Sequence, residues 1–148
     1  MIHKLEDINW EGYENIPKGG SDEWYTYDHF GKITIQQAQK KIKKSALYYS
    51  EDFLWMPIEP FQYYISAYIN YLESDDSEYD SDGASSYIRL IEFMCEHHSE
   101  FIRPIKEDIL NSVKMVSQRQ SFYDADISIY GDFLEVEKTI VDRITKET

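Results

Sequence analysis

Cysteine and long apolar runs are nearly absent from this chain. Its single cysteine, Cys95, has no second thiol to pair with, so an internal disulfide is excluded and a reducing compartment, the cytoplasm, is expected. No stretch approaches the roughly 18 consecutive apolar residues of a membrane-spanning helix. No apolar run follows a basic start, so we expect neither a signal peptide nor a membrane protein.

Basic residues are scarce as well. The chain has 15 lysines and arginines against 28 aspartates and glutamates, which gives a net charge of −13 at pH 7. A surface of this sign repels nucleic acid and anionic lipid, so neither is expected as a partner. It attracts basic proteins and raises the rate at which they are encountered. The same charge also serves solubility alone, and composition leaves both interpretations open.

Aromatic residues, by contrast, are abundant. They make up 16% of the sequence and include 13 tyrosines, and hydrophobic residues account for 42%. Such a composition excludes intrinsic disorder. A chain of 148 residues buries about 70% of its unfolded surface, which is enough for a core without disulfides or metals. The sequence therefore predicts one globular domain over residues 1–148.

The spacing of apolar residues predicts a mainly α fold of about five helices. Thr34 and Gln37 have the spacing of a capping box, and an apolar stripe of helical period follows as far as Tyr49. Pro60 suits the first turn of a second helix, which the aromatic stripe 61–72 continues. Three further stripes predict helices over 87–103, 105–116 and 133–144, the first capped by Ser85 or Ser86 and separated from the next by Pro104.

Two segments lack a clear helical period. Residues 1–31 are predicted to form an irregular, aromatic-rich N-terminal segment ahead of a helical body over 32–148. Glycines and prolines divide this segment into loops, with at most a short helix over Leu5–Gly12. Ser121–Tyr130 alternates loosely between polar and apolar residues and is expected to be a loop or a short strand.

Charges of opposite sign occupy adjacent blocks of the chain. Between Lys32 and Tyr49 every charged residue is basic, and between Ser50 and Asp82 every charged residue is acidic. The two blocks can pair within the fold, where surface ion pairs contribute little to stability. They can also face different ways and leave an acidic face free for a partner.

The densest acidic stretch is SDDSEYDSDG, residues 74–83, which is expected to be a solvated loop between two helices. Its alternating acids ahead of Gly83 resemble the start of an EF-hand calcium loop. Such a loop ends in a bidentate glutamate, and here that position is occupied by Arg89. The match fails at this ligand, so no metal site is predicted.

No other pattern predicts catalysis or a cofactor. Cys95 lies on the apolar stripe of its helix, where burial makes a thiol inert. His97 and His98 point about 100° apart on a helix and cannot easily share a metal; we expect His98 in the core or at its edge and His97 on the surface. His29 stands beside Asp28, but adjacency in sequence does not make a catalytic pair. We therefore predict no enzymatic activity, no cofactor and no metal.

One stretch is similar to a known sequence pattern. Residues 53–68, FLWMPIEPFQYYISAY, resemble a motif of small uncharacterised bacterial proteins, W-M-P-x-E-x-F-x-Y-Y-x-x-A-Y. The resemblance covers about residues 31–100 and departs at Ile65-Ser66, where the relatives carry Leu-Pro. It implies a shared fold and no known activity. In size and charge the chain is also similar to immunity proteins from bacterial toxin–immunity pairs.

These observations favour a cytoplasmic, non-catalytic protein that binds a basic protein partner. The most concrete form is an immunity-type inhibitor that neutralises a cognate toxin such as a nuclease. The expected binding residues are five acids, whose replacement by Asn or Ser should leave folding intact, and one aromatic hot spot. They are Asp75, Asp76, Glu78, Asp80 and Asp82, with Tyr79 as the hot spot.

Two alternatives stay open. A homo-oligomeric structural protein would place its surplus aromatic residues at a self-interface. A small ligand-binding domain or enzyme would use an aromatic pocket, and a deep polar-lined pocket would favour it over a flat acidic face. The candidate lining of that pocket is Trp24, Tyr27, His29, Tyr63 and Tyr64.

Overall fold

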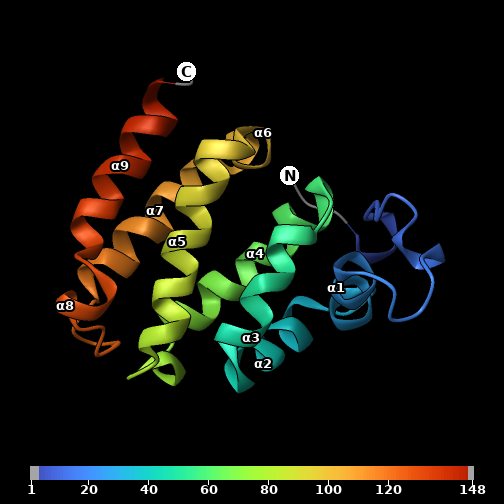
Figure 1. Ribbon diagram of the computed structural model, residues 1–148, viewed down its shortest axis with the longest axis horizontal. Coiled ribbons are helices and arrows are strands. Elements are labelled where there is room, and N and C mark those ends of the chain that lie inside the picture. Colours follow the sequence, from blue (N-terminus) through green and yellow to red (C-terminus); the bar gives the residue numbers. More distant parts are fainter. Residues whose placement is uncertain (1–3, 147–148) are drawn as a thin grey trace.

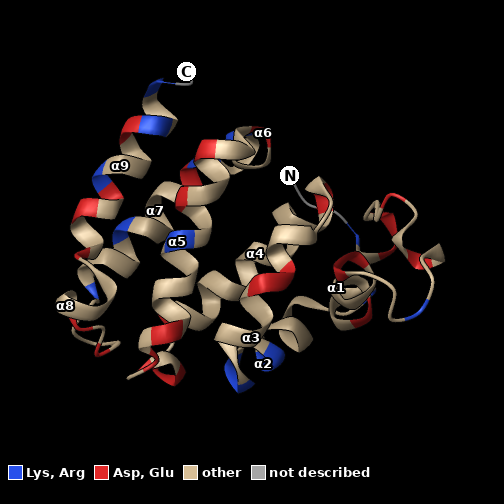
Figure 2. Cartoon of the chain, in the orientation of Figure 1, with Lys and Arg blue, Asp and Glu red and all other residues tan. Residues whose placement is uncertain are grey.

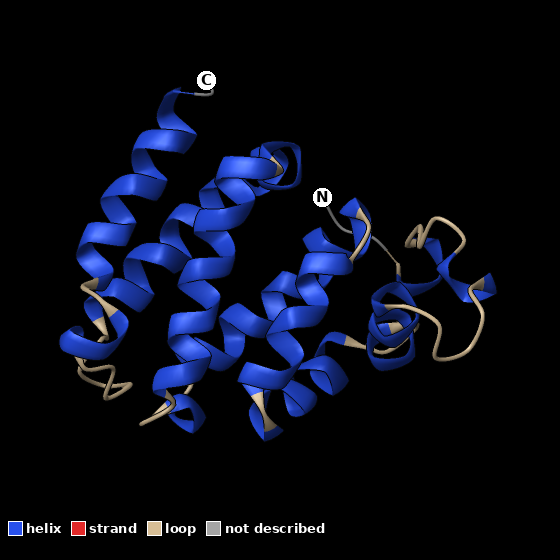
Figure 3. Ribbon diagram, in the orientation of Figure 1, coloured by secondary structure: helices blue, strands red, loops and turns tan. Residues whose placement is uncertain are grey.

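A computed structural model describes residues 4–146, and this part of the chain consists of helices and turns without a β-strand (Figure 3). The prediction of a mainly α fold is confirmed. None of the helices in the described range combines the length and the apolar character needed to cross a bilayer. The α-helices are α1 Asp22–Phe30, α2 Ile35–Lys44, α3 Ala46–Ser50, α4 Ile58–Glu73, α5 Ser81–His97, α6 Ser99–Ile102, α7 Lys106–Gln118, α8 Ile127–Tyr130 and α9 Phe133–Lys146.

Short 3-10 helices occupy several of the connections. They are η1 Leu5–Asp7, η2 Tyr13–Asn15, η3 Glu51–Trp55, η4 Asp75–Ser77 and η5 Arg103–Ile105.

The helices lie side by side along the long axis of the molecule (Figure 1). α1 and the turns before it form one end, and α9 lies at the other. Between them α2 packs against α4, α3 against α5, and both α5 and α7 against α9. Within the described residues α5 has the most α-helical neighbours, because it contacts α3, α4, α6, α7 and α9.

The predicted number of about five helices is too low. α1 lies within the N-terminal segment that was predicted to be irregular; its N-cap is Ser21, whose side chain accepts a hydrogen bond from the Trp24 N–H at 3.2 Å. The single helix predicted from Thr34 to Tyr49 is two helices. Ser45 leaves the helical conformation with φ −164° and caps α3 by accepting from the Tyr48 N–H at 3.3 Å. Residues 121–130 also end in a short helix, α8.

The helix predicted over 87–103 begins and ends earlier than its apolar stripe indicated. α5 starts at Ser81, and its N-cap is Asp80 rather than Ser85 or Ser86. It ends at His97, and the separate turn α6 and η5 follow before α7. Residues 74–83 are therefore not a loop throughout, because they contain η4 and the first turn of α5.

Other local signals are confirmed. Thr34 Oγ1 accepts from the Gln37 N–H at 3.1 Å, and Gln37 Oε1 accepts from the Thr34 N–H at 2.8 Å, which completes the capping box. Pro60 lies in the first turn of α4, where a missing N–H costs nothing. The helices predicted over 105–116 and 133–144 correspond to α7 and α9.

Aromatic rings form the centre of the core. Phe53 of η3 is fully buried, and its ring centroid lies 5.5 Å from that of Phe30, 6.0 Å from Phe61 and 5.7 Å from Tyr68. Tyr68 continues the cluster to Tyr87 at 5.0 Å. The pairs are tilted or edge-to-face, the geometries that aromatic rings prefer. The cluster joins α1, η3, α4 and α5.

Buried tyrosines in this core direct their hydroxyls to backbone carbonyls. Burial raises the pKa of these phenols, so they stay protonated and act as donors. The acceptors lie in a connection or in the end turn of a helix. The pairs are Tyr64 with Ile33 (2.7 Å), Tyr68 with Gly83 (2.6 Å) and Tyr123 with Leu72 (2.7 Å).

We expect Tyr68→Phe to lower the free energy of unfolding by about 1 kcal/mol, because the ring stays packed while its hydroxyl bond to Gly83 is lost. Urea denaturation measures the change. Tyr79→Phe is the matched control, since the Tyr79 side chain is 72% exposed and should leave the midpoint unchanged. Equal stability of the Tyr68 variant and the wild type would show that this hydroxyl does not hold α5 to α4.

Candidate functional site

The six residues predicted to bind a partner lie together where α4 passes into α5 (Figure 2). All of them except Asp80 are exposed, and they lie at the lower edge of the molecule in this view. We call four of the exposed residues, which are adjacent or nearly so in the connection, the Tyr79 surface: Asp75, Asp76, Glu78 and Tyr79.

The backbone beneath the Tyr79 surface is held by hydrogen bonds. Ser77 is fully buried, and its hydroxyl donates to the Leu72 and Ser74 carbonyls at 3.1 and 2.8 Å. The Tyr79 N–H donates to the carbonyl of Phe122, which follows α7, at 3.1 Å. The connection is thus tied both to α4 and to a distant part of the chain, and its exposed side chains project from an ordered backbone.

Tyr79 combines exposure with an unfavourable backbone conformation. Its side chain is 72% exposed, the joint highest value among the large hydrophobic residues of the described range. Its φ of +66° lies in the left-handed region, which costs about 1–3 kcal/mol for a residue other than glycine. The hydrogen bond from the Tyr79 N–H to Phe122 helps to hold the backbone in this conformation.

Asp80 is half-buried and belongs to the fold, whereas Asp82 is exposed and accepts one hydrogen bond. The Asp80 carboxylate accepts from the Gly83 N–H at 2.9 Å, as the cap of α5, and from the Tyr71 hydroxyl at 2.6 Å. Asp82 accepts from the Tyr130 hydroxyl at 2.8 Å. Asp80 therefore has a role in the fold as well as in the predicted binding set, and the expectation that Asn or Ser can replace all five acids without effect on folding stays a prediction.

The opposite charge blocks meet at this surface. Lys43 of α2 lies 3.4 Å from Asp76, and both side chains are at least half exposed, so the pair contributes little to stability. Asp75 and Glu78 are exposed beside it. The acidic block is therefore partly paired with the basic block and partly open to solvent.

The cysteine and the adjacent histidines do not form a site. Cys95 is buried, as predicted. His97 is exposed, as predicted, but His98 is exposed as well and not part of the core, because α5 ends at His97 and the chain turns there. Within residues 4–146, no three His, Cys, Asp or Glu side chains come close enough together to hold a metal ion.

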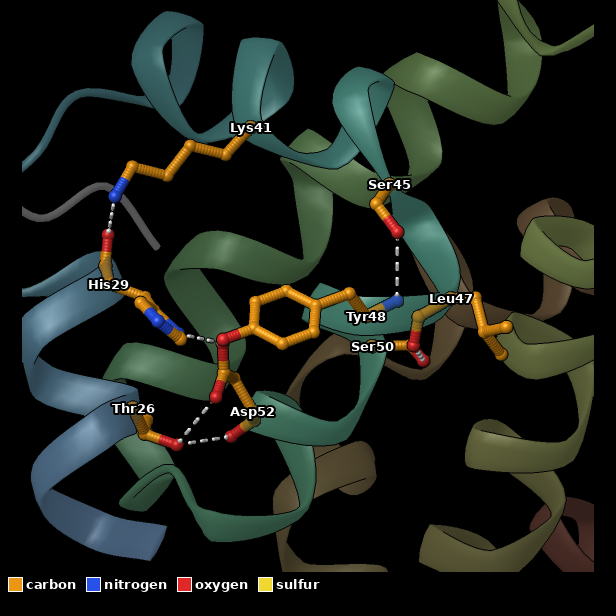
Figure 4. Close-up of polar contacts among 8 residues, drawn as sticks. All are labelled: Thr26, His29, Lys41, Ser45, Leu47, Tyr48, Ser50 and Asp52. Atoms are coloured by element: carbon orange, nitrogen blue, oxygen red, sulfur yellow. Dashed lines mark hydrogen bonds and ion pairs between the residues drawn. The ribbon is translucent and has the colours of Figure 1, made fainter.

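The structure brings together one pair of titratable residues that the sequence did not indicate. His29 Nδ1 of α1 lies 2.7 Å from Asp52 Oδ2 of η3, and their side chains are only 16% and 10% exposed (Figure 4). The Thr26 hydroxyl donates to Asp52, at 3.0 Å from its carbonyl oxygen and 3.3 Å from Oδ1. Burial raises the pKa of the Asp52 carboxyl, and the hydrogen bonds from His29 and Thr26 oppose that rise. Lys41 Nζ donates a hydrogen bond to the His29 carbonyl oxygen at 2.7 Å.

This pair lies in an open hollow of about 200 Å³ between α1, α3 and η3. Three of its aromatic side chains are partly exposed: Tyr25 by 47%, Tyr48 by 58% and Trp55 by 44%. The residues that line it, which we call the aromatic hollow, include no serine, cysteine or lysine that a histidine could activate as a nucleophile. They are Asp22, Tyr25, His29, Tyr48, Glu51, Asp52 and Trp55.

The aromatic pocket predicted from the sequence is divided between different parts of the molecule. Tyr27 packs edge-to-face on Trp10, with centroids 5.2 Å apart, and lines a hollow near the N-terminal turns. His29 lies two residues further along α1 and lines the aromatic hollow instead. Tyr64 is fully buried in the core, with the Tyr63 ring 4.8 Å away. Of the predicted lining residues, only His29 belongs to the aromatic hollow.

Comparisons with protein-family models, with curated proteins and with solved structures find no match to this chain. The resemblance of residues 53–68 to a bacterial motif therefore stays a prediction.

We expect Asp80→Ala to lower the free energy of unfolding by about 2 kcal/mol, because α5 loses its cap and the Tyr71 hydroxyl loses its acceptor. Asp75→Ala removes the same charge from an exposed position of the same connection and should change stability by less than about 0.5 kcal/mol. Urea denaturation of the two variants separates the roles. Equal loss in both would contradict the assignment of Asp80 to the fold.

Proposed function

We propose that this protein is a non-catalytic acidic binding protein that docks onto a basic protein partner through the Tyr79 surface. The observation that carries the proposal is the exposed Tyr79 ring, held at a left-handed backbone angle on an ordered connection with acids on either side. Strain of this kind persists only where the surroundings impose it, and it clusters at functional sites.

The order of the connection favours tight binding. Fixing a flexible side chain at an interface costs roughly 0.5–1.5 kcal/mol, and ordering a loop adds to that. Here the hydrogen bonds of Ser77 and of the Tyr79 N–H already fix the backbone in the unbound protein. A tyrosine side chain also has only two rotatable angles for its large contact area. Tyr79 therefore has the properties of an interface hot spot.

The neighbouring charges suit a basic partner. Asp75 and Glu78 are exposed beside Tyr79, and acids in such positions act mainly on the rate of association. The lysines of α2 lie at the same lower edge of the molecule in Figure 2, and Lys43 contacts Asp76. This boundary between acidic and basic surface favours one orientation of the partner over others.

The most specific form of the proposal is an immunity-type inhibitor of a toxin such as a nuclease. A nuclease binds phosphates through basic side chains, and an acidic protrusion with a central aromatic ring can cover such a site. The net charge of −13 supports this form, since it draws a basic enzyme in and keeps nucleic acid away.

We expect the protein, immobilised as bait, to retain one basic protein in stoichiometric amount from lysate of its source organism. Tyr79→Ala should weaken that complex by about 30-fold or more, the loss typical of a hot spot. Alanine keeps a Cβ at this position, so the strained backbone is retained while the ring is removed. Calorimetry with the purified partner measures the loss, and undiminished affinity would contradict the proposal.

The acids are tested separately through the association rate. The variant Asp75→Asn/Asp76→Asn/Glu78→Gln should associate more slowly at low salt, with a difference that shrinks as salt screens the charges. The matched control removes three exposed acids from α7 and α9 and should behave as the wild type apart from a small effect of net charge. Its substitutions are Glu107→Gln, Glu135→Gln and Asp142→Asn.

A further inference from the structure

We infer that the aromatic hollow is a binding site for a guanidinium group, the head of an arginine side chain presented by a protein partner. The hollow lies on α1, α3 and η3, away from the Tyr79 surface, and the observations that support it are independent of that surface.

The carboxylates that line the hollow favour a cationic ligand. Asp22 and Glu51 are exposed, and Asp52 lies beneath them with both carboxylate oxygens already hydrogen-bonded, one to His29 and one to Thr26. No lysine or arginine is among the residues that line it, and the nearby Lys41 is engaged with the His29 carbonyl. The free acceptors are therefore the Asp22 and Glu51 carboxylates at the rim, where a guanidinium can form paired hydrogen bonds.

The aromatic walls select a planar cation. Tyr25, Tyr48 and Trp55 line this hollow, and about half of the surface of each residue is exposed to solvent, although large aromatic side chains gain by burial. A guanidinium stacks on aromatic faces and loses less hydration on leaving water than an ammonium group does. Aromatic walls beside carboxylates therefore fit arginine better than lysine.

The His29 ring at the base of the hollow is packed and hydrogen-bonded. The His29 ring packs against Tyr48 at 5.5 Å and edge-on against Tyr49 at 5.2 Å, while its Nδ1 is fixed by Asp52. A buried His–Asp pair of this kind does little for stability compared with apolar residues of the same size. Its presence under an open, acidic and aromatic surface is what a pre-formed binding site requires.

The test uses a small probe, N-acetyl-arginine methylamide, titrated into the full chain and followed by NMR at the Trp55 indole and the His29 ring. We expect saturable shifts at both residues. The citrulline analogue, which has the same shape without the charge, should give none, and the lysine analogue should bind more weakly. The absence of saturation, or equal binding of the citrulline or lysine analogue, would overturn the inference.

Variants locate the interaction. Glu51→Gln should weaken arginine binding by about tenfold, because one charged hydrogen-bonded pair is lost. Glu107→Gln on α7 removes the same charge elsewhere and should not weaken it. Tyr48→Phe should retain binding, while Tyr48→Leu should lose about two- to fivefold with the aromatic face. Unchanged affinity in both Glu51→Gln and Tyr48→Leu would refute this site. That result would not bear on the proposal that the Tyr79 surface binds a basic protein, because the arginine probe is titrated without that protein.

Discussion

The need of buried phenol hydroxyls for an acceptor governs this fold. A tyrosine ring supplies apolar area, but its hydroxyl has to find a partner once it leaves water. Tyr64 and Tyr68 of α4 donate to Ile33 and Gly83, and thereby position both the connection before α2 and the first turn of α5. The Tyr123 hydroxyl donates in the same way to the Leu72 carbonyl in the last turn of α4. Because the helices are short, these hydrogen bonds determine where the helix ends lie relative to one another.

Signals that act over three or four residues could be predicted from the sequence, and contacts between distant residues could not. The Thr34–Gln37 capping box was visible because both partners lie in one turn. Ser45 separates α2 from α3 although the apolar stripe continues across it. The helical spacing of apolar residues cannot show that a single polar residue within it has an extended backbone. The charged neighbours of Tyr79 predict that its side chain is exposed. Its backbone conformation could not be predicted, because it involves a hydrogen bond to the distant Phe122 carbonyl. The His29–Asp52 pair needs α1 to pack on η3, and neither element was expected.

The short helix α3 lies between the two surfaces of interest. It carries Tyr48 of the aromatic hollow and packs against α5 just after the Tyr79 surface. The contact is close, since a Cβ at Gly83 would lie 2.9 Å from the Ala46 Cβ and would also collide with the Asp80 carboxylate. Glycine at position 83 therefore lets α3 approach α5 and lets Asp80 reach over the start of the helix. α3 therefore contacts the elements that carry both surfaces.

The connection between α4 and α5 also separates positions that the fold needs from positions that it leaves free. Ser77, Asp80 and Gly83 have buried or close contacts that few other residues can make. Asp75, Glu78 and the Tyr79 side chain project into solvent between them. Substitutions at these free positions can accumulate with little loss of stability, so recognition of one partner can be exchanged for recognition of another within a few mutations. Such a division allows the exposed surface to change in sequence while the architecture beneath it is kept.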